Sequence, residues 1–224
     1  MLHPVRWLLT GITLLVLAAV GFGAWYVFGG SAPAKPQLSA CTARPHPTAL
    51  AGKWTVDPAA KGYVGYRMTE VFTGDVVHKT AVGRTPAVSG SLTFAGSTVT
   101  AVDVVAQMQQ LTSDRSPRDN YIHTHAIESD TFPTSGFKLT APVALPSSTM
   151  CTTLHVAAKG MLKLHGVTRP ITIPLEAHWD GRAIQVIGSV PIVLADYKIT
   201  PPETSVVKAD DHGALELSLT FVKP

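Results

Sequence analysis

The chain has 224 residues, of which 46% are hydrophobic and 15% charged, so it is more apolar than an ordinary soluble domain. Its formal net charge of +3 comes from the first 51 residues, which hold Arg6, Lys35 and Arg44 and no acidic residue. The remainder is formally neutral and has no basic tract. This distribution excludes a nucleic-acid-binding domain.

Residues 7–28 carry no charge and, at about 1.5 Å per residue in a helix, are long enough to cross a hydrocarbon core of about 30 Å. Trp7, Trp25 and Tyr26 lie near the ends of this segment, where interfacial aromatic residues are common. Arg6 favours a cytoplasmic N-terminus. We therefore expect a cytoplasmic tip (1–6), a single-pass transmembrane helix (7–28) in the cell membrane, and an extracytoplasmic domain.

Three other interpretations of the N-terminus stay open. One is a buried helix of a globular domain, although 22 uncharged residues at an N-terminus rarely serve that purpose. Ala32 and Ala34 form an A-x-A-like site, so the apolar segment is alternatively a cleaved signal peptide. Residues 38–41, Leu-Ser-Ala-Cys, resemble a lipidation box, although such a box normally adjoins the apolar segment directly.

Residues 29–51 are rich in Gly, Ala, Pro and Ser, which predicts a linker between the membrane and a folded domain at 52–224. The chain has two cysteines, Cys41 in this linker and Cys151 in the folded domain. An even number of cysteines outside the cytoplasm is compatible with one disulfide, and the alternative is two independent thiols.

The folded domain shows period-two alternation of apolar and polar residues, which is typical of strands with one dry and one wet face. Long strands of this kind favour an all-β, antiparallel eight-stranded barrel over a sandwich. The expected strands are 63–72, 88–94, 99–111, 137–141, 152–164, 169–178, 183–194 and 214–222.

Residues 160–177 show the alternation on both sides of a polar turn at His165 to Thr168 and predict an antiparallel hairpin. Its inward side chains are expected to be Leu162, Leu164, Ile171, Ile173 and Leu175.

Residues 113–133 interrupt the strand pattern. Ser116 followed by Pro117 is a helix start signal, and Ile122 and Ala126 follow at helical spacing, so we expect a short helix that caps one end of the barrel. Charged residues cluster at the start of this helix. Arg118 and Asp119 bind a ligand headgroup in one interpretation and pair with neighbouring charges in the other.

Signals for catalysis and metal binding are weak. His123 and His125 form an H-x-H pair, but no H-E-x-x-H spacing, G-x-S-x-G elbow or phosphate-binding glycine loop is present in the sequence. We therefore expect no enzyme activity, no metal and no cofactor. An enzyme would depend on His123, His125 and Asp119.

A barrel of about eight strands either is filled by its own side chains or holds one small ligand. Small residues such as Ala106, Ala158, Gly160 and Gly188 are expected to leave room, although a packed core is equally compatible with the composition. The expected ligand-binding residues are Tyr66, Met68, Val104, Met108, Ile122, Phe132, Phe137, Leu139 and the five inward residues of the hairpin.

Several short motifs together resemble the YceI-like family. They are WTVDP at 54–58, Arg118-Asp119 followed by Phe132-Pro133 and Phe137, the hairpin GMLKLHGVTRP, and DYKI at 196–199. The resemblance implies a lipocalin-like eight-stranded barrel, exported to the cell envelope, that binds an isoprenoid or quinone-like amphiphile without catalysis or metal.

One stretch departs from that family pattern. Residues 73–88 are longer and more polar than the usual short turn. This departure leaves open an alternative function, a cell-envelope interaction module with a filled barrel that contacts a protein through its outer surface or through a loop at 73–87.

Overall fold

The computed structural model describes residues 32–72, 77–146, 149–205 and 207–224. The compact unit that contains the barrel runs from Pro33 to Pro224. The expected membrane anchor at 7–28 lies outside the described residues. No helix within the described ranges has the length and apolar character needed to span a membrane.

The described residues form a single antiparallel sheet with short helical segments between some of its strands. The strands are β1 (Gly52–Val56), β2 (Tyr63–Phe72), β3 (Val77–Thr85), β4 (Val88–Ala95), β5 (Thr98–Gln107), β6 (Thr134–Leu139), β7 (Val143–Ala144), β8 (Leu154–Leu164), β9 (Val167–Trp179), β10 (Ala183–Val193) and β11 (Val207–Val222). The helical segments are η1 (Met108–Gln110), α2 (Ser116–Tyr121), the π-helical turn η2 (Ile122–Ala126) and η3 (Leu194–Tyr197).

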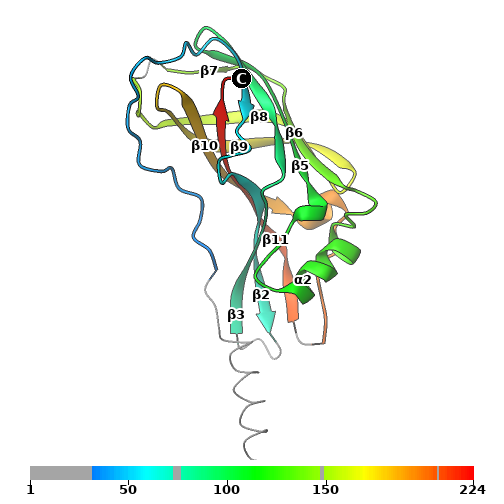
Figure 1. Ribbon diagram of the computed structural model, residues 1–224. Helices are drawn as coiled ribbons and strands as arrows, with labels where there is room; N and C mark the ends of the chain where they lie inside the picture. The colour runs from blue at the N-terminus through cyan, green and yellow to red at the C-terminus, as the bar shows by residue number, and fades with distance from the viewer. Residues whose placement is uncertain (1–31, 73–76, 147–148, 206) are drawn as a thin grey trace, which may run out of the picture. The chain divides into compact units, whose positions relative to one another are not determined.

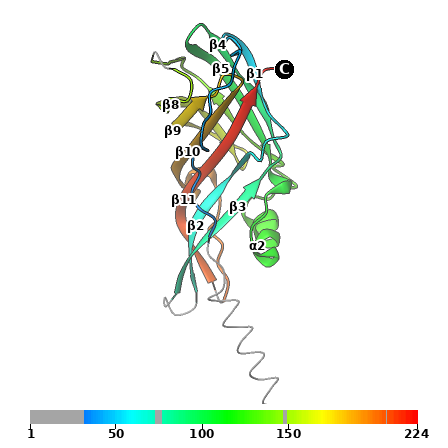
Figure 2. The same cartoon turned by 60° about the vertical axis from the view of Figure 1, so that its left-hand side comes forward.

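The sheet closes on itself because β1 pairs with β4 on one side and with β11 on the other. The closed ring is β1-β4-β5-β6-β8-β9-β10-β11, which confirms the predicted eight-stranded antiparallel barrel. The hairpin β2–β3 continues the sheet from the same edge of β11, as Figures 1 and 2 show. The predicted short helix is also present, as α2.

The structure corrects the strand prediction at several places. The strand expected at 99–111 ends at Gln107, where η1 begins, and the strand expected at 214–222 starts already at Val207. Residues 77–85, expected to belong to a loop, form β3, which pairs with β2 over its whole length. Residues 52–56 form β1, which was not among the expected strands although its Trp54 belongs to a predicted motif. The helix start is also shifted by one residue, because Arg115 is the N-cap and makes no side-chain cap bond.

The two ends of the barrel differ in construction. We call the end formed by residues 108–133, the β8–β9 turn and η3 the helical end. The end formed by residues 140–146, residues 149–153 and the β9–β10 turn is the disulfide end. Each end has its own cluster of buried apolar residues, centred on Trp54 and Phe221 toward the disulfide end and on Leu164 and Tyr197 toward the helical end.

The β8–β9 hairpin turns over only two residues, His165 and Gly166, both with positive φ (49° and 72°). This is the backbone of a type I′ turn, in which glycine is favoured. The His165 ring lies 3.0 Å from the Tyr197 carbonyl oxygen through Nδ1 and 2.8 Å from the Glu128 carboxylate through Nε2. The turn is therefore tied both to η3 and to the segment that follows η2.

Residues 33–51, which we call the strap, are attached along the outside of the barrel and appear as the blue segment in Figure 1. Its Cys41 is joined to Cys151 by a disulfide across 110 residues of sequence, which confirms the predicted pairing. Arg44 also contacts Asp180 at 2.9 Å. The linker predicted at 29–51 is thus bound to the barrel from its fifth residue onward.

The disulfide gives evidence on the protein's location and on the alternative that Cys41 carries a lipid. A structural disulfide indicates an extracytoplasmic location, since thiols stay reduced in the cytoplasm. Because the Cys41 sulfur is bonded to Cys151, it is not available to carry a lipid in this structure.

Candidate ligand cavity

The barrel encloses a cavity of about 280 Å³. This is roughly twice the ~150 Å³ of an engineered apolar protein cavity that stays dry and holds benzene. Residues from β2, every strand from β4 to β11, and the helical segments η1, η2 and η3 form its wall, and most of them are aliphatic or aromatic. The barrel is therefore not filled by its own side chains.

The cavity is elongated along the strands. On β8 its lining extends from Leu154 to Leu164, which at about 3.3 Å per residue is roughly 33 Å of strand. With a strand tilt of about 40°, this corresponds to roughly 25 Å along the barrel axis. The space suits a long, narrow apolar chain better than a compact polar molecule.

The structure brings most of the expected ligand-binding residues to this cavity. Those in the lining are Tyr66, Met68, Val104, Met108, Ile122, Phe137, Leu139, Leu162, Leu164, Ile173 and Leu175. They come from four strands of the closed ring, from β2 beside it and from two helical segments, so residues distant in sequence meet at the cavity.

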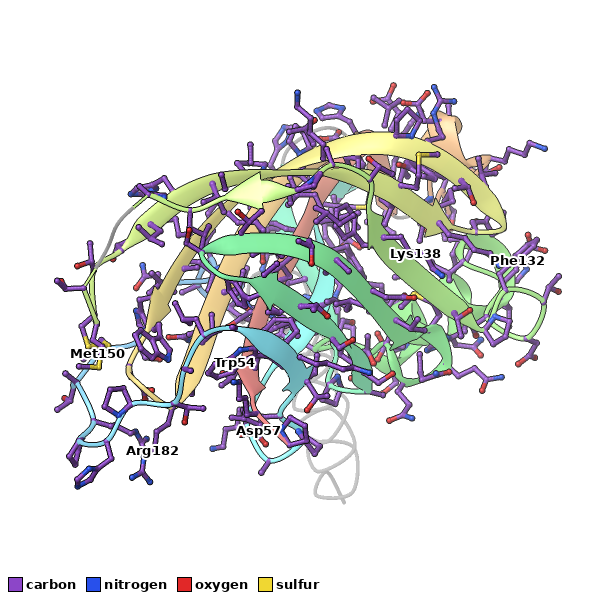
Figure 3. The ribbon with its side chains drawn as sticks, turned by 90° about the horizontal axis from the view of Figure 1, so that it is seen from above. Trp54, Asp57, Phe132, Lys138, Met150 and Arg182 are labelled. Carbon is purple, nitrogen blue, oxygen red and sulfur yellow. A yellow bond between two sulfur atoms is a disulfide. The ribbon has the colours of Figure 1, made fainter. Side chains whose placement is uncertain are left out.

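Two expected residues lie elsewhere. Phe132 packs edge-on against the His165 ring, with centroids 4.4 Å apart, and also touches Gly166. In Figure 3 it lies on the side of the molecule opposite Met150. Ile171 packs against the buried cluster of the helical end without reaching the cavity. Both residues therefore support the β8–β9 hairpin instead of lining the cavity.

The sequence prediction also missed part of the wall. Val186, Val190 and Ile192 on β10 and Leu217, Leu219 and Phe221 on β11 line the cavity too. Their signal was clear on β11, where apolar and polar residues alternate over 215–221, and weaker on β10, where Pro191 and Val193 on the other face are also apolar.

Glycines shape the wall by admitting neighbouring rings. A Cβ on Gly160 would lie 2.4 Å from the Phe137 ring, and one on Gly83 would lie 2.2 Å from the Tyr66 ring. The room at Gly160 and Gly188, expected to stay open, is taken by Phe137 and Leu175. Of the four small residues expected to leave room, Ala106 and Ala158 do border the cavity.

Few polar side chains line the cavity. Of these, His178 is uncharged and Glu216 is paired with an arginine. Burial lowers the pKa of His178, with Asp180 opposing the shift, so the imidazole is neutral at pH 7. Glu216, only 2% exposed, is engaged by Arg67 at 2.5 Å. Among the described lining residues, no charge is left to hold an ionic ligand inside the barrel.

Arg118 and Asp119 hold helix α2 in position at the helical end through hydrogen bonds. Arg118 donates two hydrogen bonds of 2.7 Å to Glu70 on β2 and further bonds to Asp114 and to the Ser113 hydroxyl. Burial opposes the charged form of Arg118, but the hydrogen bonds and charge of Glu70 raise its pKa overall. Asp119 accepts bonds from the Ser113 amide and hydroxyl. All of these bonds hold α2 against β2 and the preceding loop.

The two histidines of the H-x-H pair each contact a different neighbour. The His123 ring lies 2.9 Å from the Ser129 hydroxyl, and the His125 ring stacks on Tyr121. Within the described ranges, no group of three or more His, Cys, Asp or Glu residues is placed to hold a metal ion.

The closed eight-stranded antiparallel ring belongs to the class of small β-barrels, whose interior is either filled by side chains or open as a cavity, and here a cavity is present. Sequence comparison then identifies the family, because the YceI-like domain model matches residues 54–221. The chain belongs to the YceI-like family.

Its relatives include proteins of Vibrio. A UPF0312 protein of Vibrio vulnificus is 30% identical over 132 residues, which cover 55% of this chain and 67% of that protein. A UPF0312 protein of Vibrio parahaemolyticus is 29% identical over 150 residues, covering 63% of this chain and 74% of that protein.

Two solved structures share the fold. The polyisoprenoid-binding domain of Saccharophagus degradans aligns with a TM-score of 0.59 at 16% identity, over 78% of this chain and 99% of that domain. Burkholderia cenocepacia BcnA aligns with a TM-score of 0.55 at 18% identity, over 74% of this chain and 98% of BcnA.

Proposed function

We propose that this barrel binds an isoprenoid or similar amphiphilic lipid, including quinone-like molecules, and that it acts by binding alone. The observation that carries the proposal is the elongated apolar cavity inside the closed ring. Membership of the YceI-like family supports it, as does the shared fold with a domain that binds polyisoprenoids in Saccharophagus degradans.

The energetics of the cavity support such a ligand. Burying about 300 Å² of apolar ligand surface contributes roughly 7 kcal/mol at about 25 cal/mol per Å². This gain is offset by the loss of translational and rotational freedom on binding. A longer apolar chain buries more surface for the same offset, so affinity is expected to rise with chain length until the cavity is full.

The tether is part of the proposal. A transmembrane helix at residues 7–28 would hold the barrel beside the membrane in which an isoprenoid lipid resides. The strap, which would follow this helix in the sequence, is part of the folded unit from Pro33 onward.

The alternative function, an interaction module with a filled barrel, is not favoured. The barrel contains a cavity, and most of the loop suggested as its contact surface is strand β3.

The test is to purify the full chain in a non-ionic detergent, extract it with organic solvent and identify bound lipids by mass spectrometry. The matched variants are Ala158→Leu, which extends a side chain into the cavity, and Ala157→Leu, which makes the same change at an exposed position. We expect about one isoprenoid per protein, reduced at least tenfold by the first variant only. Equal lipid in all three proteins, or none in the wild type, would contradict the proposal.

A further inference from the structure

A second hollow lies outside the barrel, between the strap and the outer wall. This strap groove has a volume of about 380 Å³ and is separate from the lipid cavity. The strap forms one side of it from Ala34 to Ser39, and the other side consists of outward-facing residues of β2, β3, β10 and β11 together with Lys61.

Hydrogen bonds to the barrel hold the strap over this groove. Arg67 donates to the Pro33 carbonyl at 2.7 Å and Arg84 donates to the Ala34 carbonyl at 2.8 Å. Farther along, the Ser39 amide donates to the Gln185 side chain at 2.9 Å. The strap side of the groove is therefore attached to the barrel at both of its ends, at Pro33–Ala34 and at Ser39.

The charge lining the groove is of one sign. Lys35, Lys61 and Arg84 contribute cations, and none of the described lining residues is Asp or Glu. Neither lysine has an ion-pair partner among the described residues.

One carboxylate, Glu216, is shared by two arginines beside the groove. Glu216 accepts two hydrogen bonds from Arg67, at 2.5 and 3.2 Å, and forms a longer ion pair of 3.9 Å with Arg84. The Arg84 guanidinium, whose side chain is only 28% exposed, lies over the Tyr63 ring at 4.0 Å. Because one negative charge serves two cations, a net positive charge remains beside the two lysines of the groove, and it favours an anion from outside the chain.

We propose that the strap groove is a binding site for a phosphate group. Three cations match an anion with more than one negative charge or one with several acceptor oxygens. Hydroxyl groups of Tyr63, Ser218 and Thr220, which also line the groove, supply neutral donors for those oxygens. The volume exceeds that of a bare phosphate ion, so the phosphate of a lipid headgroup and free phosphate are both possible sources.

The experiment is isothermal titration calorimetry of the full chain in a non-ionic detergent. The probes are inorganic phosphate and dihexanoyl phosphatidylglycerol, each at constant ionic strength set with sodium chloride. The test variant is Lys35→Gln with Lys61→Gln. The matched control is Lys159→Gln with Lys163→Gln, which removes two exposed cations from the outer face of β8.

We expect saturable binding of at least one probe, weakened about tenfold or more in the test variant and less than twofold in the control. Binding of phosphatidylglycerol but not of inorganic phosphate assigns the groove to a lipid headgroup, and binding of inorganic phosphate assigns it to the free ion. Absence of saturable binding for both probes overturns the proposal, and so does equal weakening in the two double variants. The result is independent of whether the barrel interior holds a lipid.

Discussion

Replacing Ala158 by leucine tests whether the cavity is open, because the larger side chain should stabilise a barrel with an open cavity and destabilise one with a packed core. Ala158 is 5% exposed and borders the cavity, so the added side-chain carbons enter empty space. Three buried carbons contribute about 2.4 kcal/mol at ~0.8 kcal/mol each. Fixing the leucine rotamer costs about 0.5 to 1 kcal/mol. We therefore expect the lipid-free barrel to gain about 1.5 kcal/mol of unfolding free energy while it loses lipid binding.

The assay is urea unfolding of delipidated protein, followed by tryptophan fluorescence. Ala157→Leu serves as the control and is expected to change the unfolding free energy by less than about 0.5 kcal/mol, because Ala157 is exposed. In a packed core the leucine at 158 would instead be forced against its neighbours and destabilise the protein by about 1 to 3 kcal/mol. A destabilisation of that size would refute the assignment of an open cavity.

Three further predictions concern the barrel's supports. Changing Cys41 and Cys151 to serine should cost about 5 kcal/mol of unfolding free energy in the chain-entropy model, measured by urea unfolding, and an unchanged midpoint would contradict it. Arg118→Met should cost about 3 kcal/mol or more because it strands the buried Glu70 carboxylate, whereas adding Glu70→Gln should restore most of the loss in the same assay. Burial lowers the pKa of His178 below its ordinary 6.5, so the folded protein holds this imidazole in its neutral form. The free energy of unfolding should therefore fall as the pH drops below about 6.5, where the unfolded chain binds the proton more readily. His178→Gln should flatten this slope, and an unaltered pH profile would count against the prediction.

Alternation predicted the strands that have one dry and one wet face. The expected and observed limits of β2, β8 and β10 agree within two residues for that reason. In β3 the consecutive residues Ala81, Val82 and Gly83 are all buried, so both faces of the strand are covered and no alternation appears. Such a strand is not distinguishable from a loop by periodicity.

The cavity residues were predictable where they lie in strands and less so outside them. Phe132 belongs to an irregular segment, and the direction of its side chain depends on the His165 ring that it contacts. The strap was missed for a related reason. Its composition is that of a linker, but it is held by Arg67, Arg84 and Asp180, residues distant in sequence that no local pattern connects to it.

The disulfide between Cys41 and Cys151 also changes what a protease could release. A single cut anywhere between these two residues opens a covalent ring and leaves both pieces joined through sulfur. A cut before Cys41, for instance at the A-x-A-like site of Ala32 and Ala34, would free the whole barrel with its ring intact. In the membrane-anchored arrangement proposed above, release of the barrel under oxidising conditions would therefore need a cut between the helix at 7–28 and Cys41.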